Sequence, residues 1–165
     1  VVVAGDSAGG GLAAACAQRS SAVVGQVLLY AAIDADVTRA SYIEKSGILI
    51  GVEEMSWFFD HYLPDPAERT DPRFAALQGP VADAPPAVVV VAGHDPLHDE
   101  GIAYAEALRA AGIPVLVREF PTLPHGFLRF TATVPAAGAA ADEVAELAAG
   151  LVREVTTSAV THPVR

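Results

Sequence analysis

The chain opens on Val1-Val2-Val3-Ala4-Gly5-Asp6-Ser7-Ala8-Gly9-Gly10, where an apolar run leads into a serine placed among small residues. Gly5, Ser7 and Gly9 have the G-x-S-x-G spacing of a nucleophile elbow, in which a strand turns sharply into a helix. Such a turn holds its serine in a strained backbone conformation and exposes the hydroxyl at the sheet edge. We expect glycine two residues before and two after Ser7 because side chains at both places would clash. The stretch therefore predicts a nucleophilic serine.

Length and composition bound the class of protein. The 165 residues are 52% hydrophobic and 18% charged, as in a globular domain with a core of its own. The net charge of −10 argues against nucleic acid and anionic membranes as partners, because both require basic patches. The single cysteine, Cys16, excludes an internal disulfide and favours a reducing compartment, so we expect a cytoplasmic protein. No apolar run is long enough to span a bilayer.

Apolar runs alternate with helical patterns along the chain. Buried strands are predicted at residues 1–4, 23–30, 87–92 and 115–120, and helices at residues 8–19, 53–63, 96–111 and 136–155. Residues 31–51 and 64–86 are expected to be loops. The alternation predicts an α/β fold in which helices cover both faces of a mostly parallel sheet. Sites in such sheets lie beyond the carboxyl ends of the strands.

Some side chains are interpreted as structural. Cys16 is expected to be a packed core thiol rather than a reactive one. His61 and His162 are expected to be structural or solvated. One aromatic-rich cluster is expected to belong to the core rather than to a ligand site. It comprises Met55, Trp57, Phe58, Phe59 and Tyr62.

An acid and a histidine follow the last two predicted strands. A serine hydroxyl is a weak nucleophile, so it requires a base and an acid that orients the base, and this fold class places them in the order serine, acid, histidine. Asp95 follows the third strand, and His125 lies five residues beyond the fourth. Asp95 before Pro96 is an equally good helix cap. The position of His125 favours a catalytic base over a surface histidine.

His94 and His98 raise the question of a metal site, because they are four residues apart beside two aspartates. Pro96 interrupts the helical face that such a ligand pair needs, and no distant third ligand stands out. We therefore expect neither a metal nor another cofactor.

In combination these motifs resemble the hormone-sensitive lipase family of α/β-hydrolases. The matching stretches are GDSAGG (5–10), WFFDHYL (57–63), DPLHDEG (95–101), AYAEALRAAGIPV (103–115) and HGF (125–127). The resemblance covers nearly all of the chain. It implies a carboxylesterase acting on short- to medium-chain acyl esters, a small-molecule substrate.

The resemblance also implies roles for individual residues. Ser7 would be the nucleophile, His125 the base and Asp95 the acid, with the amide of Ala8 donating to the oxyanion. Asp6 and Gly10 would complete the elbow. Two further matching residues, Asp99 and Glu100, are interpreted as helix-start and scaffold groups.

The chain departs from the family pattern upstream of the elbow. The His-Gly-Gly-Gly loop, the first four strands and the cap helices are missing from this sequence. Ala31 replaces the usual proline, and Asp71 replaces a frequent serine. We therefore expect residues 1–165 to be the C-terminal part of one catalytic domain, ending in a flexible tail at 156–165. Because an oxyanion donor is lost, these residues alone should show little esterase activity.

Alternative functions stay open. The scaffold could carry another acyl hydrolase, such as an amidase or lactonase, or the chain could be an inactive fragment. A non-catalytic small-molecule binding module is a further alternative, as in the plant gibberellin receptors, which resemble this family but lack the catalytic histidine. His125 in an intact HGF context argues against that alternative. The oligomeric state also stays open, and because members of the family often pair through the last strand, here residues 115–120, the resemblance makes a homodimer one alternative.

Overall fold

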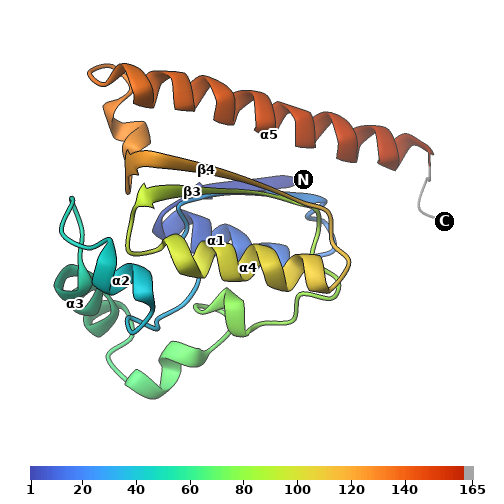
Figure 1. The fold of residues 1–165 in the computed structure, drawn as a ribbon. Coiled ribbons are helices and arrows are strands. Elements are labelled where there is room, and N and C mark those ends of the chain that lie inside the picture. Colours follow the sequence, from blue (N-terminus) through green and yellow to red (C-terminus); the bar gives the residue numbers. More distant parts are fainter. Residues whose placement is uncertain (162–165) are drawn as a thin grey trace.

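The computed structural model describes residues 1–161, with the side chains of residues 1–157. Within them the centre is a parallel sheet of four strands in the order β1-β2-β3-β4 (Figure 1). The strands are β1 (Val2–Asp6), β2 (Gly25–Leu29), β3 (Ala87–His94) and β4 (Val115–Pro124). All neighbours pair in parallel, with Val2 opposite Gly25 at one edge. The predicted α/β architecture is confirmed.

Helices cover both faces of this sheet (Figure 1). They are α1 (Ala8–Ala17) and α4 (His98–Ala110) on one face and α5 (Pro135–Thr161) on the other. The valines of β3 show why the strand is apolar throughout. Val89 and Val91 pack in the core under α1 and α4, whereas Val88 and Val90 pack in the core under α5. Both faces of β3 are therefore buried, as its sequence predicts.

A long excursion joins β2 to β3: its first part lies beyond the carboxyl ends of the strands, and the rest returns beneath α1 and α4 to the start of β3 (Figure 1). It contains α2 (Ala40–Glu44), α3 (Val52–Tyr62) and two 3-10 turns, η1 (Pro66–Thr70) and η2 (Ala76–Gln78). Helix α3 confirms the helix predicted at 53–63. Helix α2 corrects the prediction that 31–51 is all loop. It is too short to show a sustained apolar period, yet it buries Tyr42 against Met55 and Phe59.

Strands β3 and β4 extend beyond their predicted ends at residues 92 and 120. Gly93 permits the extension, because a Cβ there would lie 2.1 Å from the carbonyl oxygen of Pro121. Proline is tolerated in β4 because this strand is an edge of the described sheet. As a result, Asp95 and His125 each follow directly on the end of a strand.

One expectation about burial near the N-terminus holds in part and another is wrong. Strand β1 has β2 as its only partner among the described residues and its side chains are intermediate or exposed, although Val2 and Val3 pack against the cores on opposite faces of the sheet. Cys16 is exposed rather than packed in the core. It lies four residues after Leu12, which is also exposed, so both belong to the outward face of α1.

The predicted tail at 156–165 is helical over the part that the structure describes. Helix α5 continues to Thr161, and the hydroxyl of Thr156 donates to the carbonyl of Val152 at 2.7 Å. No glycine or proline interrupts the helix between Gly150 and Pro163, which explains the longer helix. His162 lies outside the described residues.

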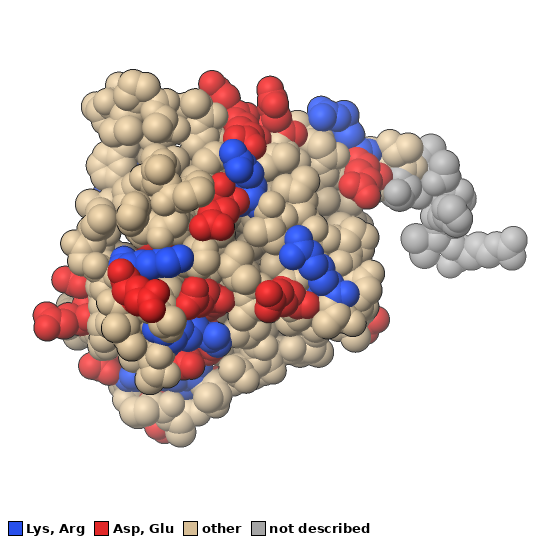
Figure 2. Space-filling model, in the orientation of Figure 1, with Lys and Arg blue, Asp and Glu red and all other residues tan. Residues whose placement is uncertain are grey.

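The surface mixes charges of both signs. Figure 2 shows acidic side chains beside basic ones over the face drawn there. Ion pairs account for part of this pattern, such as Arg69 with Asp60 and Arg118 with Glu143. None of the helices within residues 1–161 combines the length and apolarity needed to cross a membrane.

Candidate active site

Ser7 forms a tight junction between β1 and α1. Its backbone has φ 52° and ψ −123°, a positive-φ conformation that costs a residue with a Cβ about 1–3 kcal/mol. Hydrogen bonds hold it in place. The amide of Ser7 donates to the carbonyl of Leu29 at 2.9 Å, and its own carbonyl accepts from the amides of Gly10 and Ala32, each at 3.0 Å. The elbow is thus fixed to the end of β2 and to the residues after it.

Close backbone packing explains most of the glycines in this elbow. A Cβ on Gly5 would lie 2.1 Å from the carbonyl oxygen of Gly9. A Cβ on Gly10 would lie 2.4 Å from the Cβ of Ala31. The expected clash at Gly9 itself is wrong, because a Cβ there would meet nothing within 4 Å. Of Gly5 and Gly9, therefore, only Gly5 must lack a side chain to avoid a clash.

The structure brings the three predicted residues Ser7, His125 and Asp95 together. The Oγ of Ser7 lies 2.9 Å from Nε2 of His125, and Nδ1 of His125 lies 2.9 Å from Oδ2 of Asp95. Asp95 is fully buried and His125 is 8% exposed. A neutral imidazole that donates from Nδ1 to the carboxylate presents an unprotonated Nε2 to the serine hydroxyl. This arrangement can accept the hydroxyl proton.

The cap residue of α4 is Leu97, without a side-chain cap hydrogen bond, so the interpretation of Asp95 as the helix cap is wrong. The Oδ1 of Asp95 accepts from the amide of Leu97 at 2.8 Å, while Oδ2 faces His125. Helix α4 begins at His98, two residues later than predicted, so Asp95 forms the turn before the cap residue Leu97. A carboxylate has two oxygens, so the turn and the histidine contact do not compete.

The loop of His125 is held by aromatic packing. The ring of Tyr30 meets the imidazole edge-on, with centroids 5.0 Å apart, and meets Phe127 at 5.3 Å. Gly126 adopts a left-handed conformation with φ 67°, which starts the 3-10 turn η3 (Phe127–Phe130). Burial, followed by the negative charge of Asp6, raises the pKa of Tyr30 to about 12. The hydroxyl therefore stays protonated at neutral pH.

A cavity of about 510 Å³ opens beside Ser7. Its walls come from the elbow, α1, α3, the loop after η1 and the His125 loop. The lining residues are Ser7, Ala8, Gly11, Leu12, Ala32, Ile50, Met55, Phe58, Phe59, His61, Tyr62, Arg73, Phe74 and His125. Ala8 is the first residue of α1, where free amides can stabilise an anion. Most of the wall is apolar.

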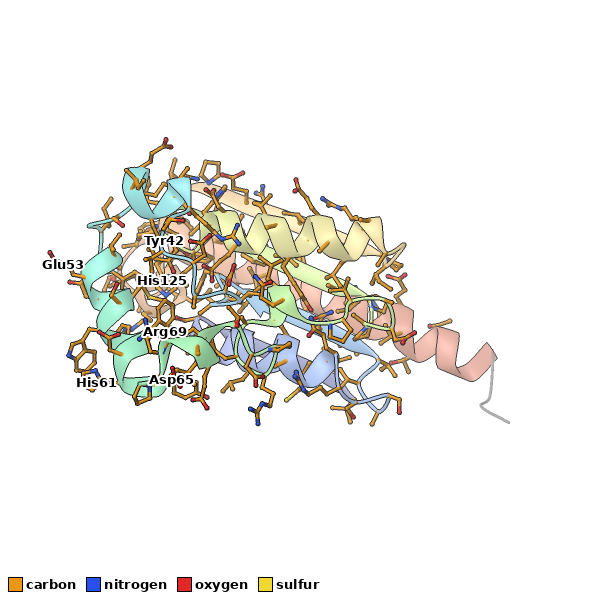
Figure 3. The ribbon with its side chains drawn as sticks, turned by 90° about the horizontal axis from the view of Figure 1, so that it is seen from below. Tyr42, Glu53, His61, Asp65, Arg69 and His125 are labelled. Carbon is orange, nitrogen blue, oxygen red and sulfur yellow. The ribbon has the colours of Figure 1, made fainter. Side chains whose placement is uncertain are left out.

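The aromatic cluster of α3 corrects the prediction that it is all core. Phe59 is buried, but Phe58 and Tyr62 are 48% and 64% exposed, and all three line the cavity. His61 also lines it and stacks on Trp57, with centroids 4.0 Å apart. Figure 3 shows His61 on the outer side of α3, farther from the sheet than His125. Apolar spacing alone does not distinguish a core face from a cavity wall.

The wall also includes residues that the sequence did not single out. Ile50, Arg73 and Phe74 come from segments expected to be loops. The sequence predicts only that residues 31–51 and 64–86 are loops, and no spacing in them marks which side chains face inward. Only the return of the chain past α3 places Phe74 against Phe59, with ring centroids 5.5 Å apart.

The neighbouring acidic residues have structural contacts. Asp99 accepts from the amide of Ser41 at 2.9 Å, and Glu100 accepts from the amide of Ile33 at 2.7 Å. The ring of His98 lies between Asp99 and Glu119, at 2.9 Å and 3.2 Å. Among the described residues, no group of three or more histidine, cysteine or acidic side chains could hold a metal ion.

Comparison with known proteins identifies the fold family of the chain. A family profile described as alpha/beta hydrolase fold matches residues 1–129. The chain belongs to the α/β-hydrolase fold family. This α/β-hydrolase chain is 41% identical over 137 residues to an ethyl acetate hydrolase of Pseudomonas putida, covering 78% of the chain and 43% of that protein. It is 39% identical over 149 residues to the esterase LipI of Mycobacterium tuberculosis, covering 83% of the chain and 45% of that protein.

A solved structure extends the α/β-hydrolase match to nearly all of the chain. A fungal esterase from Rhizomucor miehei superposes with a TM-score of 0.86 at 31% identity, covering 98% of this chain and 52% of that one. The resemblance to the hormone-sensitive lipase family is confirmed. The chain spans about half the length of the curated relatives it matches.

Proposed function

We propose that the protein is a serine carboxylesterase that hydrolyses short- to medium-chain acyl esters. The observation that carries the proposal is the continuous contact from Ser7 through His125 to Asp95, with both steps at 2.9 Å. The names of the relatives described above, which are ester hydrolases, support the same reaction. The mostly apolar cavity beside Ser7 suits a small acyl or alkyl group.

The proposed reaction follows from the contacts. Ser7 attacks the ester carbonyl while Nε2 of His125 takes its proton, and Asp95 stabilises the imidazolium that forms. The amide of Ala8 donates to the oxyanion. His125 then protonates the departing alcohol, and water hydrolyses the acyl-enzyme with His125 again as the base. No cofactor takes part in this scheme.

Active-site labelling tests the proposal, in the longest natural chain that contains these 165 residues. A fluorophosphonate probe should modify Ser7, as located by mass spectrometry, and p-nitrophenyl acetate and butyrate should be turned over. Ser7→Ala should abolish both, whereas Ser20→Ala, a change at an exposed serine beyond α1, should abolish neither. An unlabelled protein that binds a small ester without turnover would instead support a binding module.

The leaving group separates the carboxylesterase from other acyl hydrolases. Matched p-nitrophenyl esters and p-nitroanilides with the same acyl chain differ only in the bond that is broken. We expect turnover of the esters at least 100-fold faster, which is about 2.7 kcal/mol in activation free energy. Comparable rates on the anilides would make the protein an amidase.

Partner and location are proposed on narrower grounds. Strand β4 is an edge of the described sheet and carries Leu116 at 44% exposure, which suits pairing with a second copy through residues 115–120. Light scattering of the wild type and of Leu116→Lys checks this.

A reducing, cytoplasmic location is proposed because Cys16 is the only cysteine of the chain, and fractionation of the host cell tests it. We propose no nucleic-acid partner, given the net charge of −10.

A further inference from the structure

Glu100 is a buried carboxyl that the proposed reaction does not use. It lies in the first turn of α4 and is 0% exposed. Its Oε1 accepts from two successive backbone amides, Ile33 at 2.7 Å and Asp34 at 3.3 Å. Its Oε2 lies 3.4 Å from the hydroxyl of Tyr42, on α2. One side chain thus joins α4, α2 and the turn that follows β2.

That turn is in direct contact with the elbow. The amide of Ala32 donates to the carbonyl of Ser7 at 3.0 Å, and Ala32 lines the cavity. Gly10 approaches Ala31 so closely that a Cβ on it would lie 2.4 Å from the Cβ of Ala31. Residues 31 and 32 are therefore in direct contact with the elbow at Ser7 and Gly10.

We propose that Glu100 is a positioning residue, which holds the turn at residues 31–34 against the elbow and thereby places Ser7 opposite His125. The chain of contacts runs from the carboxyl of Glu100 through the amide of Ile33 to Ala32, and from Ala32 to Ser7. Glu100 acts through these neighbours and touches no reacting atom. The expected effect of Glu100 on turnover rests on the proposed function, whereas its hydrogen bonds to the turn at residues 31–34 do not depend on that function.

The groups that face Glu100 determine whether its carboxyl is protonated, and the protonation state affects how it holds the turn. Asp34, on the turn, is buried and pairs with Arg39 at 2.5 Å. Burial, together with the negative charge of Asp34, raises the pKa of Glu100 to about 8, although the two amides and Arg39 act in the opposite direction. The facing hydroxyl of Tyr42 is also buried, and the pKa of Tyr42 is raised.

The two protonation states hold the turn differently. The neutral carboxyl accepts both amides on its carbonyl oxygen and keeps a hydroxyl for Tyr42. The ionised form keeps both amide contacts, which favour the charge, but its negative charge repels that of the buried Asp34 on the same turn. Gln at this position mimics the neutral form, because an amide has the same acceptor and a donor. Leu removes the acceptor.

Hydrogen exchange measures the hold on the turn, in the same full-length protein. Glu100→Leu should speed exchange at least tenfold in peptides that cover residues 31–36 and 4–11, and Glu100→Gln should leave both protected. Glu106→Gln is the matched control, since Glu106 is an exposed carboxyl on the same helix. If Glu100→Leu speeds hydrogen exchange within α4 alone and leaves the exchange of residues 4–11 unchanged, the proposal is overturned. This comparison of peptides within one variant holds even when Glu100→Leu is less stable than the wild type.

Turnover measures the effect on Ser7. Glu100→Leu should lower kcat for p-nitrophenyl butyrate by roughly 10- to 100-fold with little change in KM, as expected from misplacement of a reacting group. Glu100→Gln should keep the wild-type rate at pH 6.5 and lose a decline that the wild type shows above pH 8. The same alkaline decline in wild type and Glu100→Gln would overturn the proposal. Absence of turnover in the wild type, with the exchange pattern as expected, would count against the esterase function alone.

Discussion

The Nδ1 atom of His125 lies 2.9 Å from Oδ2 of Asp95, a carboxylate with no exposed surface. The pair comes from two neighbouring strands, because Asp95 follows β3 and His125 follows β4. The parallel register puts both strand ends at one edge of the sheet, where Ser7 also lies at the end of β1. The contact therefore follows from the topology, and the first prediction tests its chemical role.

Asp95→Asn should lower kcat by a factor on the order of 10⁴, because an amide nitrogen facing Nδ1 would favour the wrong imidazole tautomer. The Oδ1 contact with Leu97 can survive this change, so we expect the melting temperature to fall by only a few degrees. Steady-state kinetics and thermal melts followed by circular dichroism check the two expectations. Asp99→Asn, the control, should keep most of the activity, and an equal loss in both variants would contradict the role given to Asp95.

Gly5 and Gly9 offer a matched pair at the elbow. Gly5→Ala should destabilise the protein strongly, because the new Cβ would lie 2.1 Å from the carbonyl of Gly9. Gly9→Ala should be tolerated and could add up to about 1 kcal/mol of stability, because position 9 is helical and its Cβ would meet open space. Urea denaturation of both variants is the measurement. Similar losses of stability would show that the backbone packing at the elbow differs from that described.

Phe58 should contribute to substrate binding through the cavity wall. Phe58→Ala removes apolar surface that a bound acyl chain would cover, so we expect KM for p-nitrophenyl butyrate to rise about five- to tenfold. The effect should be smaller for the acetate, which reaches less of the wall. Ile43→Ala is the control, since Ile43 is 76% exposed on α2 and does not line the cavity. Equal effects on both esters would place Phe58 outside the acyl site.

Much of the fold could be predicted because its signals are local. The valines of β3 are apolar on both faces, and the packing of Val88 and Val89 on opposite sides of the sheet is what such a run predicts. The placement of Asp95 and His125 could also be predicted, because strand order and strand ends fix where they lie. The sequence predicts the end of β4 too early, because proline is normally absent from a strand. An edge strand such as β4 tolerates proline, whereas a central strand does not.

The remaining features depend on contacts that no local pattern encodes. Cys16 is exposed because α1 turns its other face to the sheet, and a helix of alanines gives no sign of which face that is. Phe58 and Phe59 are adjacent in the sequence, yet one is half exposed and the other is buried. Both line the cavity, and Phe74 joins its wall only because the loop that carries Phe74 returns past α3 and packs against Phe59. Burial of Glu100 likewise depends on a turn 66 residues away.

Stability should depend on pH through Glu100. Its pKa is raised from an ordinary value of 4.5 to about 8, so between these values the folded protein holds a proton that the unfolded chain has released. The stabilisation is fully present below pH 4.5 and is lost as the pH rises through about 8. Each pKa unit corresponds to about 1.4 kcal/mol, so the loss across this window should amount to a few kcal/mol.

Glu100→Gln isolates this contribution, because the amide does not titrate. The free energy of unfolding in urea, measured at steps from pH 5 to pH 9, should fall for the wild type relative to Glu100→Gln as the pH rises. The two proteins should differ least at pH 5 and most at pH 9. The other titratable groups are shared by both, so their pH dependence cancels in the difference. Parallel curves across the range would mean that Glu100 keeps the same charge in the folded and unfolded chains.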